Sequence, residues 1–177
     1  MKNYLKFVPL LLVIFVFGCS KDEAPDPRQI FVGTFEMEDY NTLVTFGTDD
    51  SLFSVSANSD IEFLQREGLH ADELVVDIED FTNEVIQKTL GEIAVSTIFT
   101  IDFEEDVLTE ISSDEFELYF YFPLMISDGG TTQELICKFE GEGEINGDEI
   151  EIEYEITLYA GVGANYVFSG TAVGTRD

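Results

Sequence analysis

The sequence predicts an all-β fold, either an antiparallel meander barrel or a β-sandwich, on three observations. Nearly every segment after residue 30 alternates polar residues with β-branched or aromatic ones, which is the periodicity of a half-buried strand. Gly, Asn, Asp and Pro interrupt these segments where turns are expected. The 16 phenylalanines and a hydrophobic content of 45% supply a core large enough for one domain.

The alternating segments define ten expected strands. They cover residues 30–37, 41–46, 51–57, 73–79, 92–103, 107–112, 115–126, 132–145, 149–159 and 165–175. Residues 60–66 fit either a further strand or a turn of helix. The strands at 92–103 and 115–126 would each be roughly 40 Å long at about 3.3 Å per residue, which favours a curved barrel or a large sandwich. Closing the sheet into a barrel would also remove its exposed edges.

One segment breaks the alternation and predicts at most one short helix, near residues 80–91. Asp80 or Thr82 would cap its start, and Gly91 would end it. Phe81 and Val85 fall on one side of such a helix, which is the spacing of an apolar face that packs against a core.

The strands 132–145 and 149–159 predict a hairpin around Asn146 and Gly147, because Asn-Gly tolerates the positive φ angles of a type I′ turn. Pairing outward from that turn sets Gly143 opposite Ile150, Gly141 opposite Ile152, Phe139 opposite Tyr154, Cys137 opposite Ile156 and Leu135 opposite Leu158. The other face then pairs Glu144 with Glu149, Glu142 with Glu151, Glu140 with Glu153 and Lys138 with Glu155. Glycines opposite large isoleucines indicate a bend in a curved sheet or a close approach of another segment.

Gly33, Thr34 and Phe35 in the first strand, with Arg176 after the last, resemble the Gly-x-Trp opening and the terminal arginine of lipocalin-like barrels. In that family the arginine packs across the aromatic ring and closes one end of the barrel. Phenylalanine stands here where the family has tryptophan. The resemblance implies a lipocalin-like barrel, while other small antiparallel barrels and sandwiches stay open as alternatives.

The amino-terminal segment has the features of an export signal. Lys2 and Lys6 precede an apolar run over residues 7–17, which is short for a membrane span. The small residue directly before Cys19 resembles the end of a bacterial lipobox, in which a signal peptidase cuts before an acylated cysteine. The resemblance implies a lipoprotein signal peptide over residues 1–18 and lipidation of Cys19. A plain secretory signal and an uncleaved anchor are the alternatives.

The residues after this cysteine refine the expected location. Lys21, Asp22 and Glu23 resemble the surface-export signal of lipoproteins from the Bacteroidota phylum; the alternative is an acidic tether that no receptor reads. Residues 19–29 would form an acidic linker with two prolines, and residues 30–177 a single all-β domain. We expect an outer-membrane protein, anchored by acyl chains and exposed at the cell surface.

The charge balance excludes two classes of partner. The chain has 8 basic and 37 acidic residues, a formal charge of −29, and loss of residues 1–18 would change this to −31. Nucleic acid is excluded, because binding to it depends on lysines and arginines that neutralise phosphates. Attraction to anionic lipid is excluded for the same reason, so the membrane contact would come from the acyl chains on Cys19.

The sequence shows no recognisable catalytic chemistry. Cys137 falls on one face of its strand with Leu135 and Phe139, which predicts a small buried hydrophobe, and the only histidine is His70. There is no nucleophile elbow, metalloprotease helix or glycine-rich phosphate loop. We therefore predict no enzyme activity and no catalytic residues.

Two sets of side chains are candidate binding sites. A cavity for a small apolar ligand, or else a solid core, would be lined by Phe99, Phe103, Phe116 and Phe120. Calcium prefers oxygen ligands and could be gathered by Glu142, Glu144, Glu149 and Glu151, although solvation on an exposed face is the simpler interpretation. No other cofactor is expected. Tyr119 and Tyr121 could point outward as a platform for a glycan, but packing or a structural surface role is favoured.

These observations favour a non-catalytic envelope lipoprotein that binds a small apolar ligand. The alternative is a structural or interaction component of an outer-membrane surface complex, which would bind another envelope protein through an exposed face or a sheet edge. A surface hydrolase is the third hypothesis, and it would need a cleft with convergent polar side chains.

Overall fold

The computed structural model describes residues 26–46, 49–55, 59–93, 98–101, 103, 106–159 and 165–176 of the chain. Its elements are η1 (Pro27–Ile30), β1 (Gly33–Phe46), β2 (Asp49–Val55), β3 (Ser59–Leu64), β4 (Glu73–Asp77), α2 (Glu79–Ile93), β5 (Ile98–Ile101), β6 (Val107–Ser112), β7 (Glu115–Asp128), β8 (Thr131–Asn146), β9 (Glu149–Tyr159) and β10 (Asn165–Arg176). The predicted signal peptide, Cys19 and the predicted export signal at Lys21, Asp22 and Glu23 lie outside the described residues.

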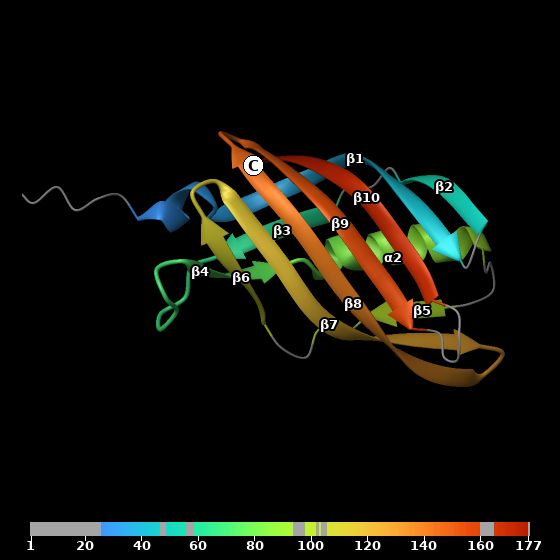
Figure 1. Ribbon diagram of the computed structural model, residues 1–177. Coiled ribbons are helices and arrows are strands. Elements are labelled where there is room, and N and C mark those ends of the chain that lie inside the picture. Colours follow the sequence, from blue (N-terminus) through green and yellow to red (C-terminus); the bar gives the residue numbers. More distant parts are fainter. Residues whose placement is uncertain are drawn as a thin grey trace, which may run out of the picture.

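Eight strands form a closed antiparallel barrel (Figure 1). In chain order β1, β3, β4, β6, β7, β8, β9 and β10 each pair with the next, and β10 pairs back with β1. Strand β2 adds to β1, and β5 adds to β7. The all-β prediction is confirmed, and of its two alternatives the meander barrel is right and the sandwich is wrong. Closure depends on the 14-residue β1, which pairs with β3 along one edge and with β10 along the other.

Alternation along the strands divides the core from the surface. On β9 the side chains of Ile150, Ile152, Tyr154 and Ile156 are buried, and the glutamates between them are exposed. Cys137 on β8 is buried in the same way, as predicted. Inside the barrel the Tyr154 hydroxyl shares a 2.7 Å hydrogen bond with the Thr42 hydroxyl, so this buried polar group has a partner.

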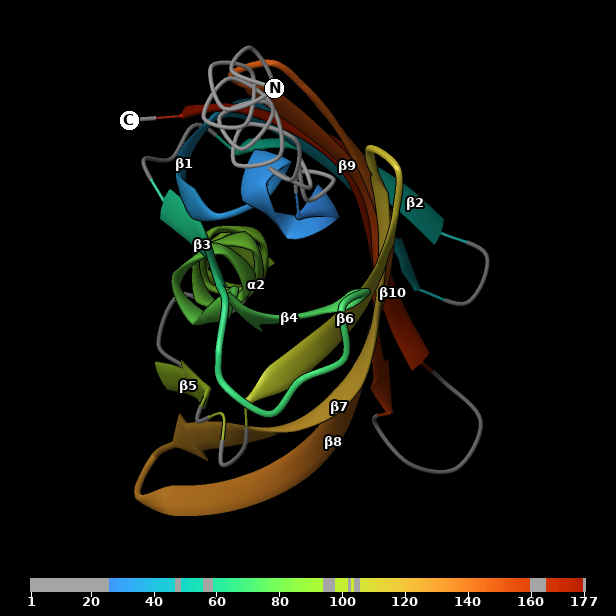
Figure 2. The same ribbon diagram turned by 90° about the vertical axis from the view of Figure 1, so that its left-hand side faces the viewer.

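Helix α2 fills much of the space that the barrel encloses. Figure 2 shows the helix lying along the concave side of the sheet, between β3 and β5. Its Phe81 ring meets the inward-facing Tyr154 ring edge to face at 5.3 Å, and Val85, Ile86 and Leu90 are also buried. Of the helices described, none has both the length and the apolar character to cross a membrane.

The single predicted helix is confirmed, but its expected ends are wrong. The helix begins at Glu79, ahead of both predicted caps, and the Thr82 N–H and hydroxyl both donate to the Ile78 carbonyl. The Asp77 carboxylate accepts a hydrogen bond from the Glu79 N–H instead. The helix also runs past Gly91 to Ile93, so this glycine lies within its last turn.

Several strand boundaries also differ from expectation. The predicted strands 30–37 and 41–46 are one strand, β1, with a register irregularity between Glu38 and Asn41. Residues 27–30 form the turn η1, whose Arg28 N–H is capped by the Asp26 carboxylate, so regular structure begins within the last residues of the predicted linker. In the described part of the predicted strand 92–103, α2 covers residues 92–93 and β5 covers residues 98–101, while residues 94–97 and 102 lie outside the described residues. Residues 59–64 form the strand β3, so of the two alternatives for residues 60–66 the strand is right and the helical turn is wrong.

The β8–β9 hairpin has the predicted faces but a different turn. Asn146 pairs with Glu149, so Gly147 and Asp148 are the two central residues, and Gly147 has a φ of +70°. Glycine at the first central position with a positive φ is typical of a type II′ turn, so the predicted type I′ turn is wrong. Moving the turn by one residue shifts each pairing by two, which leaves the inward and outward faces unchanged.

The observed pairing brings large rings over the hairpin glycines. Gly143 pairs with Ile152 and with Phe116, and a Cβ atom on Gly143 would lie 2.2 Å from the Phe116 Cζ. A Cβ on Gly141 would lie 2.9 Å from the Phe139 ring. Both glycines thus allow a close approach of an aromatic ring to the sheet, as their spacing predicts.

Arg176 and Phe35 lie together at one end of the barrel. The Arg176 Cζ is 4.8 Å from the centroid of the Phe35 ring, and its guanidinium donates to the Ile30 carbonyl. Gly33 lies against the same side chain, since a Cβ there would be 3.6 Å from the Arg176 Nε. The stacking that the lipocalin resemblance implied is present.

Candidate functional site

An aromatic hollow opens beside residues 119–123 of strand β7, which pair with no described residue on one edge. We call it the edge hollow; its volume is about 400 Å³, and it is lined by Phe103, Asp106, Val107, Leu108, Tyr119, Phe120, Tyr121, Phe122 and Pro123. Five of these nine residues are aromatic. The volume falls within the range of about 300–1,000 Å³ that is usual for small-molecule sites.

The hollow exists because two short strands cover only the ends of β7. Strand β6 pairs with residues 115–118 of β7, and β5 pairs with residues 124–127 (Figure 1). Between them, residues 119–123 pair with β8 on one edge and with no described residue on the other. Pro123 suits this stretch, because proline has no N–H to give to a ladder.

Successive side chains along residues 119–123 point to opposite faces of the sheet, and side chains from both faces line the hollow. Phe120 and Phe122 point towards the barrel interior, while Tyr119 and Tyr121 point outward and are 59% and 56% exposed. At an uncovered strand edge a hollow can reach side chains of both faces. A strand paired at this edge would lie between the inward phenylalanines and the outward tyrosines. Here both kinds of side chain line the same hollow.

The inner wall of the edge hollow consists of three phenylalanines. Phe103 lies 5.4 Å from Phe120 and 5.3 Å from Phe122 between ring centroids, and Phe120 and Phe122 are 5.9 Å apart. One face of Phe120 is covered by Phe139, with stacked rings at 4.9 Å. This arrangement holds the wall in place and leaves Phe103 and Phe120 half-buried at the opening.

The outer rim carries two linked tyrosines. Their hydroxyl oxygens are 2.9 Å apart and their rings meet edge to face at 5.7 Å. The hydrogen bond to Tyr121 is the main cause that raises the pKa of Tyr119 above its usual value. Next to this pair, Lys138 bonds to Glu140 at 2.5 Å, which raises the pKa of the lysine.

The opposite rim is formed by Asp106, whose carboxylate pairs with the Arg66 guanidinium. A second hollow of about 200 Å³ lies on the other side of Phe103, Asp106 and Val107, against β4 and the start of α2. These three residues thus separate two neighbouring hollows, and the ion pair neutralises the charge between them.

Of the four phenylalanines predicted to line a ligand site, two lie at the edge hollow. Phe103 and Phe120 line it. Phe99 on β5 faces the interior near α2 and is buried. Phe116 is buried against Phe31 and Phe63, and it also lines a separate hollow of about 410 Å³ on the outside of the sheet, next to Gly143.

Sequence reasoning missed Val107 and Leu108 as lining residues, and it favoured a structural role for the two tyrosines. Phe122 was expected to line either a cavity or a solid core, and it lines the hollow. The alternation from 119 to 122 did indicate that tyrosines and phenylalanines face opposite sides. It carries no sign of an uncovered edge, because the position of that edge depends on how β5 and β6 pair with β7.

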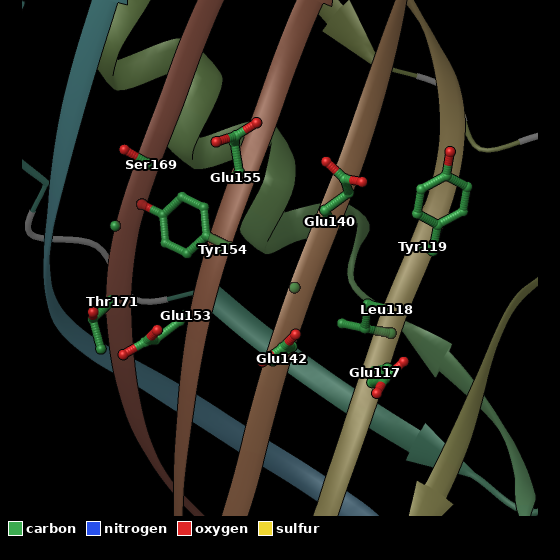
Figure 3. Close-up of a pocket in the computed structure, with 12 residues that line it drawn as sticks. Glu117, Leu118, Tyr119, Glu140, Glu142, Glu153, Tyr154, Glu155, Ser169 and Thr171 are labelled. Atoms are coloured by element: carbon green, nitrogen blue, oxygen red, sulfur yellow. The ribbon is translucent and has the colours of Figure 1, made fainter.

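A second depression, the outer groove, crosses the outside of β7, β8, β9 and β10 (Figure 3). It has a volume of about 690 Å³, and its walls carry Glu117, Tyr119, Glu140, Glu142, Glu153, Glu155, Ser169 and Thr171. Tyr119 pairs with Glu140 and Glu140 with Glu155; Glu117 pairs with Glu142 and Glu142 with Glu153. Most of these carboxylates are exposed to solvent, which screens their repulsion.

Three of the four glutamates predicted to gather calcium, Glu142, Glu144 and Glu151, line one shallow hollow of about 410 Å³ on the outside of the sheet. The fourth, Glu149, does not line it and lies opposite Asn146. Within the described ranges, no group of three or more His, Cys, Asp or Glu side chains is placed to hold a metal ion. Calcium binding stays a prediction without support from side-chain placement.

Cys137 lies in the core, away from any described catalytic arrangement. Its side chain is fully buried, and burial raises the pKa of the thiol from 9.0 to about 12. A thiol with so high a pKa is protonated at neutral pH and is a poor nucleophile.

Comparison with known proteins adds little. No protein-family model matches the chain, and no curated protein does. Among solved structures, the chain is similar to the S-type phycobiliprotein lyase CPES from Guillardia theta, at 18% identity over 89% of this chain and 98% of that one, with a TM-score of 0.32. A TM-score this low supports no functional argument.

Proposed function

We propose that this protein is a non-catalytic binding module that holds a small apolar ligand in the edge hollow. The observation that carries the proposal is the uncovered stretch of β7, where phenylalanine rings from β7 and from Phe103 form an apolar wall at the surface. Apolar walls with a few polar groups at the rim are typical of small-molecule sites. Here the tyrosine hydroxyls and the Asp106 carboxylate are those polar groups.

We propose further that the module is tethered to the outer membrane by acyl chains on Cys19 and faces the outside of the cell. The support is the resemblance of the amino-terminal segment to a lipoprotein signal and of Lys21, Asp22 and Glu23 to an export signal. An acidic domain does not adhere to anionic lipid by charge, so acyl chains would supply the attachment. Cys19→Ala should abolish fatty-acid labelling and release the protein from membranes. Labelling that persists would overturn the tether.

The ligand proposal is tested by blocking the hollow without disturbing the core. Leu108 lines the hollow and is 50% exposed, so Leu108→Trp adds volume at the opening and leaves the packed interior unchanged. The probe is N-phenyl-1-naphthylamine, an uncharged dye that fluoresces in apolar sites. We expect saturable dye binding to the wild type and at least about a tenfold loss of affinity in the variant, as expected when a ligand's apolar contact area is lost.

A matched control separates the hollow from the rest of the surface. Val173 on β10 is 44% exposed and pairs with β1 and β9 rather than with β7, so Val173→Trp adds the same side chain away from the hollow. This variant should bind the dye as the wild type does. Equal binding by all three proteins would show that the dye binds elsewhere, and the proposal would fail.

The second candidate function is an interaction component of a surface complex. It is favoured by apolar side chains that face solvent, namely Ile98 on β5, which is 67% exposed, and Ile136 and Tyr159 on the paired strands β8 and β9. Crosslinking on intact cells followed by mass spectrometry tests it: a discrete crosslinked partner, lost on Ile98→Asp and kept on Leu108→Asp, would favour this candidate over the ligand-binding one.

A further inference from the structure

The edge hollow is rich in aromatic ring faces. The rings of Phe103, Phe120 and Phe122 form its inner wall, and those of Tyr119 and Tyr121 form its outer rim. Each ring carries partial negative charge on its face and partial positive charge at its edge. Aromatic residues that surround a site from several sides therefore favour a cation over an anion, and quaternary ammonium groups are the best-known ligands of such sites.

The described charges next to the hollow do not oppose such a ligand. Among the described lining residues Asp106 carries the one carboxylate, and none is basic. Arg66 pairs with Asp106 and Lys138 pairs with Glu140, so each of these two pairs is close to neutral. Beyond the tyrosine rim, Glu117 and Glu140 line the adjoining outer groove together with Tyr119.

The whole chain adds to this local field. With 37 acidic and 8 basic residues, it produces a negative potential that concentrates cations at its surface and repels anions. An anionic lipid or fatty acid would therefore have to bring its carboxylate or phosphate against both the ring faces and this field. For a cation, both the aromatic rings and the negative potential of the chain favour binding.

We infer that the ligand of the edge hollow is an organic cation with an apolar body, of the quaternary ammonium class. The inference rests on the proposed function, because it names the ligand class of the same site. The apolar body lies against Phe103, Phe120 and Phe122, and the ammonium group lies at the tyrosine rim, on the side of Tyr119 and Glu117. A quaternary ammonium suits this place better than a primary amine, because it has no N–H donors that would need partners among the ring faces.

The test uses two probes that differ in one atom. Acetylcholine carries a quaternary nitrogen, and 3,3-dimethylbutyl acetate carries a carbon in the same place, with the same shape and no charge. Each is titrated against the full-length protein loaded with N-phenyl-1-naphthylamine, and displacement of the dye is measured. We expect the cation to displace the dye at about a tenfold lower concentration than its neutral isostere, an advantage within the range of one or two cation–π contacts.

The outcomes separate this inference from the proposed function. Equal displacement by both probes would overturn the cation preference and leave the apolar site intact. Displacement by the neutral probe alone, or by neither, would overturn it as well. A wild-type protein that fails to bind the dye would overturn both proposals together.

Variants of Tyr121 show whether the ring face is the cause. Tyr121 is exposed at the rim, so Tyr121→Leu removes the ring with little effect on folding, and Tyr121→Phe keeps the ring and removes only the hydroxyl. Loss of one cation–π contact should weaken acetylcholine binding by roughly twofold to thirtyfold in the leucine variant and leave the neutral isostere almost unchanged. The phenylalanine variant should keep the preference.

Tyr159→Leu is the matched control. Tyr159 on β9 is also partly exposed, at 38%, and does not line the hollow. Its loss should change neither probe. A preference that survives Tyr121→Leu, or that falls as much in Tyr159→Leu, would show that general surface charge attracts the cation, and the inference would be wrong.

Discussion

The barrel has two groups of phenylalanines that differ in what covers them. Phe31, Phe35, Phe63 and Phe116 form the closed cluster, in which neighbouring ring centroids lie 5.0 to 6.2 Å apart and every side chain is buried. Phe103, Phe120 and Phe122 form the open cluster, with centroids 5.3 to 5.9 Å apart, beside the edge hollow. Ring spacing is nearly the same in both, so it is not ring packing that makes one group core and the other a candidate site.

The difference lies in the backbone around each cluster. At the closed cluster, Phe31 directly follows the turn η1, and Phe35 and Phe63 lie on the paired strands β1 and β3. Phe116 lies on β7 just after the β6–β7 hairpin, and its ring packs over Gly143. At the open cluster, the described pairing of β7 with β5 covers residues 124–127 and that with β6 covers residues 115–118, so residues 119–123 pair with no described residue on that edge. Among the described residues, an aromatic cluster thus becomes a surface where strand pairing is interrupted, and variants of each cluster test this difference.

The largest effect is expected at the closed cluster. Phe116→Ala removes a fully buried ring from contact with Phe31 and Phe63, and it should lower the free energy of unfolding by about 3–5 kcal/mol. Urea denaturation followed by circular dichroism measures this. Phe103→Ala, at the half-buried open cluster, should cost clearly less and should weaken dye binding instead. Equal costs would contradict the distinction between the clusters.

High pH should weaken the interior through Tyr154. Burial raises the pKa of Tyr154 from 10.0 to about 12, so above pH 10 the unfolded chain releases this proton while the folded barrel keeps it. The free energy of unfolding should therefore fall by about 2 kcal/mol as the pH rises from 10 towards 12, and stay unaffected by this group below pH 10. Tyr154→Phe should reduce that fall. The exposed Tyr159→Phe should leave it unchanged, and a similar fall in both variants would argue against Tyr154 as its cause.

Adding one methyl group tests the close approach at Gly143. A Cβ there would lie 2.2 Å from Phe116 and 2.8 Å from the Glu151 carbonyl oxygen, so Gly143→Ala should destabilise the fold by about 1–3 kcal/mol. Gly91→Ala is the matched control, because a Cβ on that helical glycine would meet nothing within 4 Å, and this variant should gain up to about 1 kcal/mol. Thermal melts of both variants measure these changes in stability. If Gly143→Ala leaves the stability unchanged, the Phe116 ring must be free to move away from the added methyl group.

The smallest effect is expected at the rim of the open cluster. Tyr119→Phe removes one exposed hydroxyl from the hydrogen bond with Tyr121, and the stability should change by less than about 0.5 kcal/mol. Tyr154→Phe at pH 7 breaks a buried hydrogen bond with Thr42 and should cost about 0.5–1.5 kcal/mol. If Tyr119→Phe costs more than Tyr154→Phe, the tyrosine pair holds the uncovered edge of β7 in place.

Much of the fold was readable from the residues, and the candidate site was readable only in part. Alternation in EFELYFYF correctly separated Phe116, Phe120 and Phe122 from the outward tyrosines, and it indicated which side of the sheet each residue faces. It could not show that Phe116 is buried and Phe120 only half-buried beside the edge hollow, because both have the same local pattern. The hairpin turn was displaced by one residue for a related reason: Asn146–Gly147 and Gly147–Asp148 are both good turn sequences, and they give the same two faces.

By itself the sequence determined the all-β class, the inward and outward faces, the buried Cys137 and the strongly acidic surface, because period-two patterning and charge are local properties of a strand. Tertiary structure decided the closure of β10 onto β1, the filling of the interior by α2 and the uncovered edge of β7. These features depend on where strands distant in the chain begin and stop pairing, and that is set by the competition of all strands for shared edges and one common core.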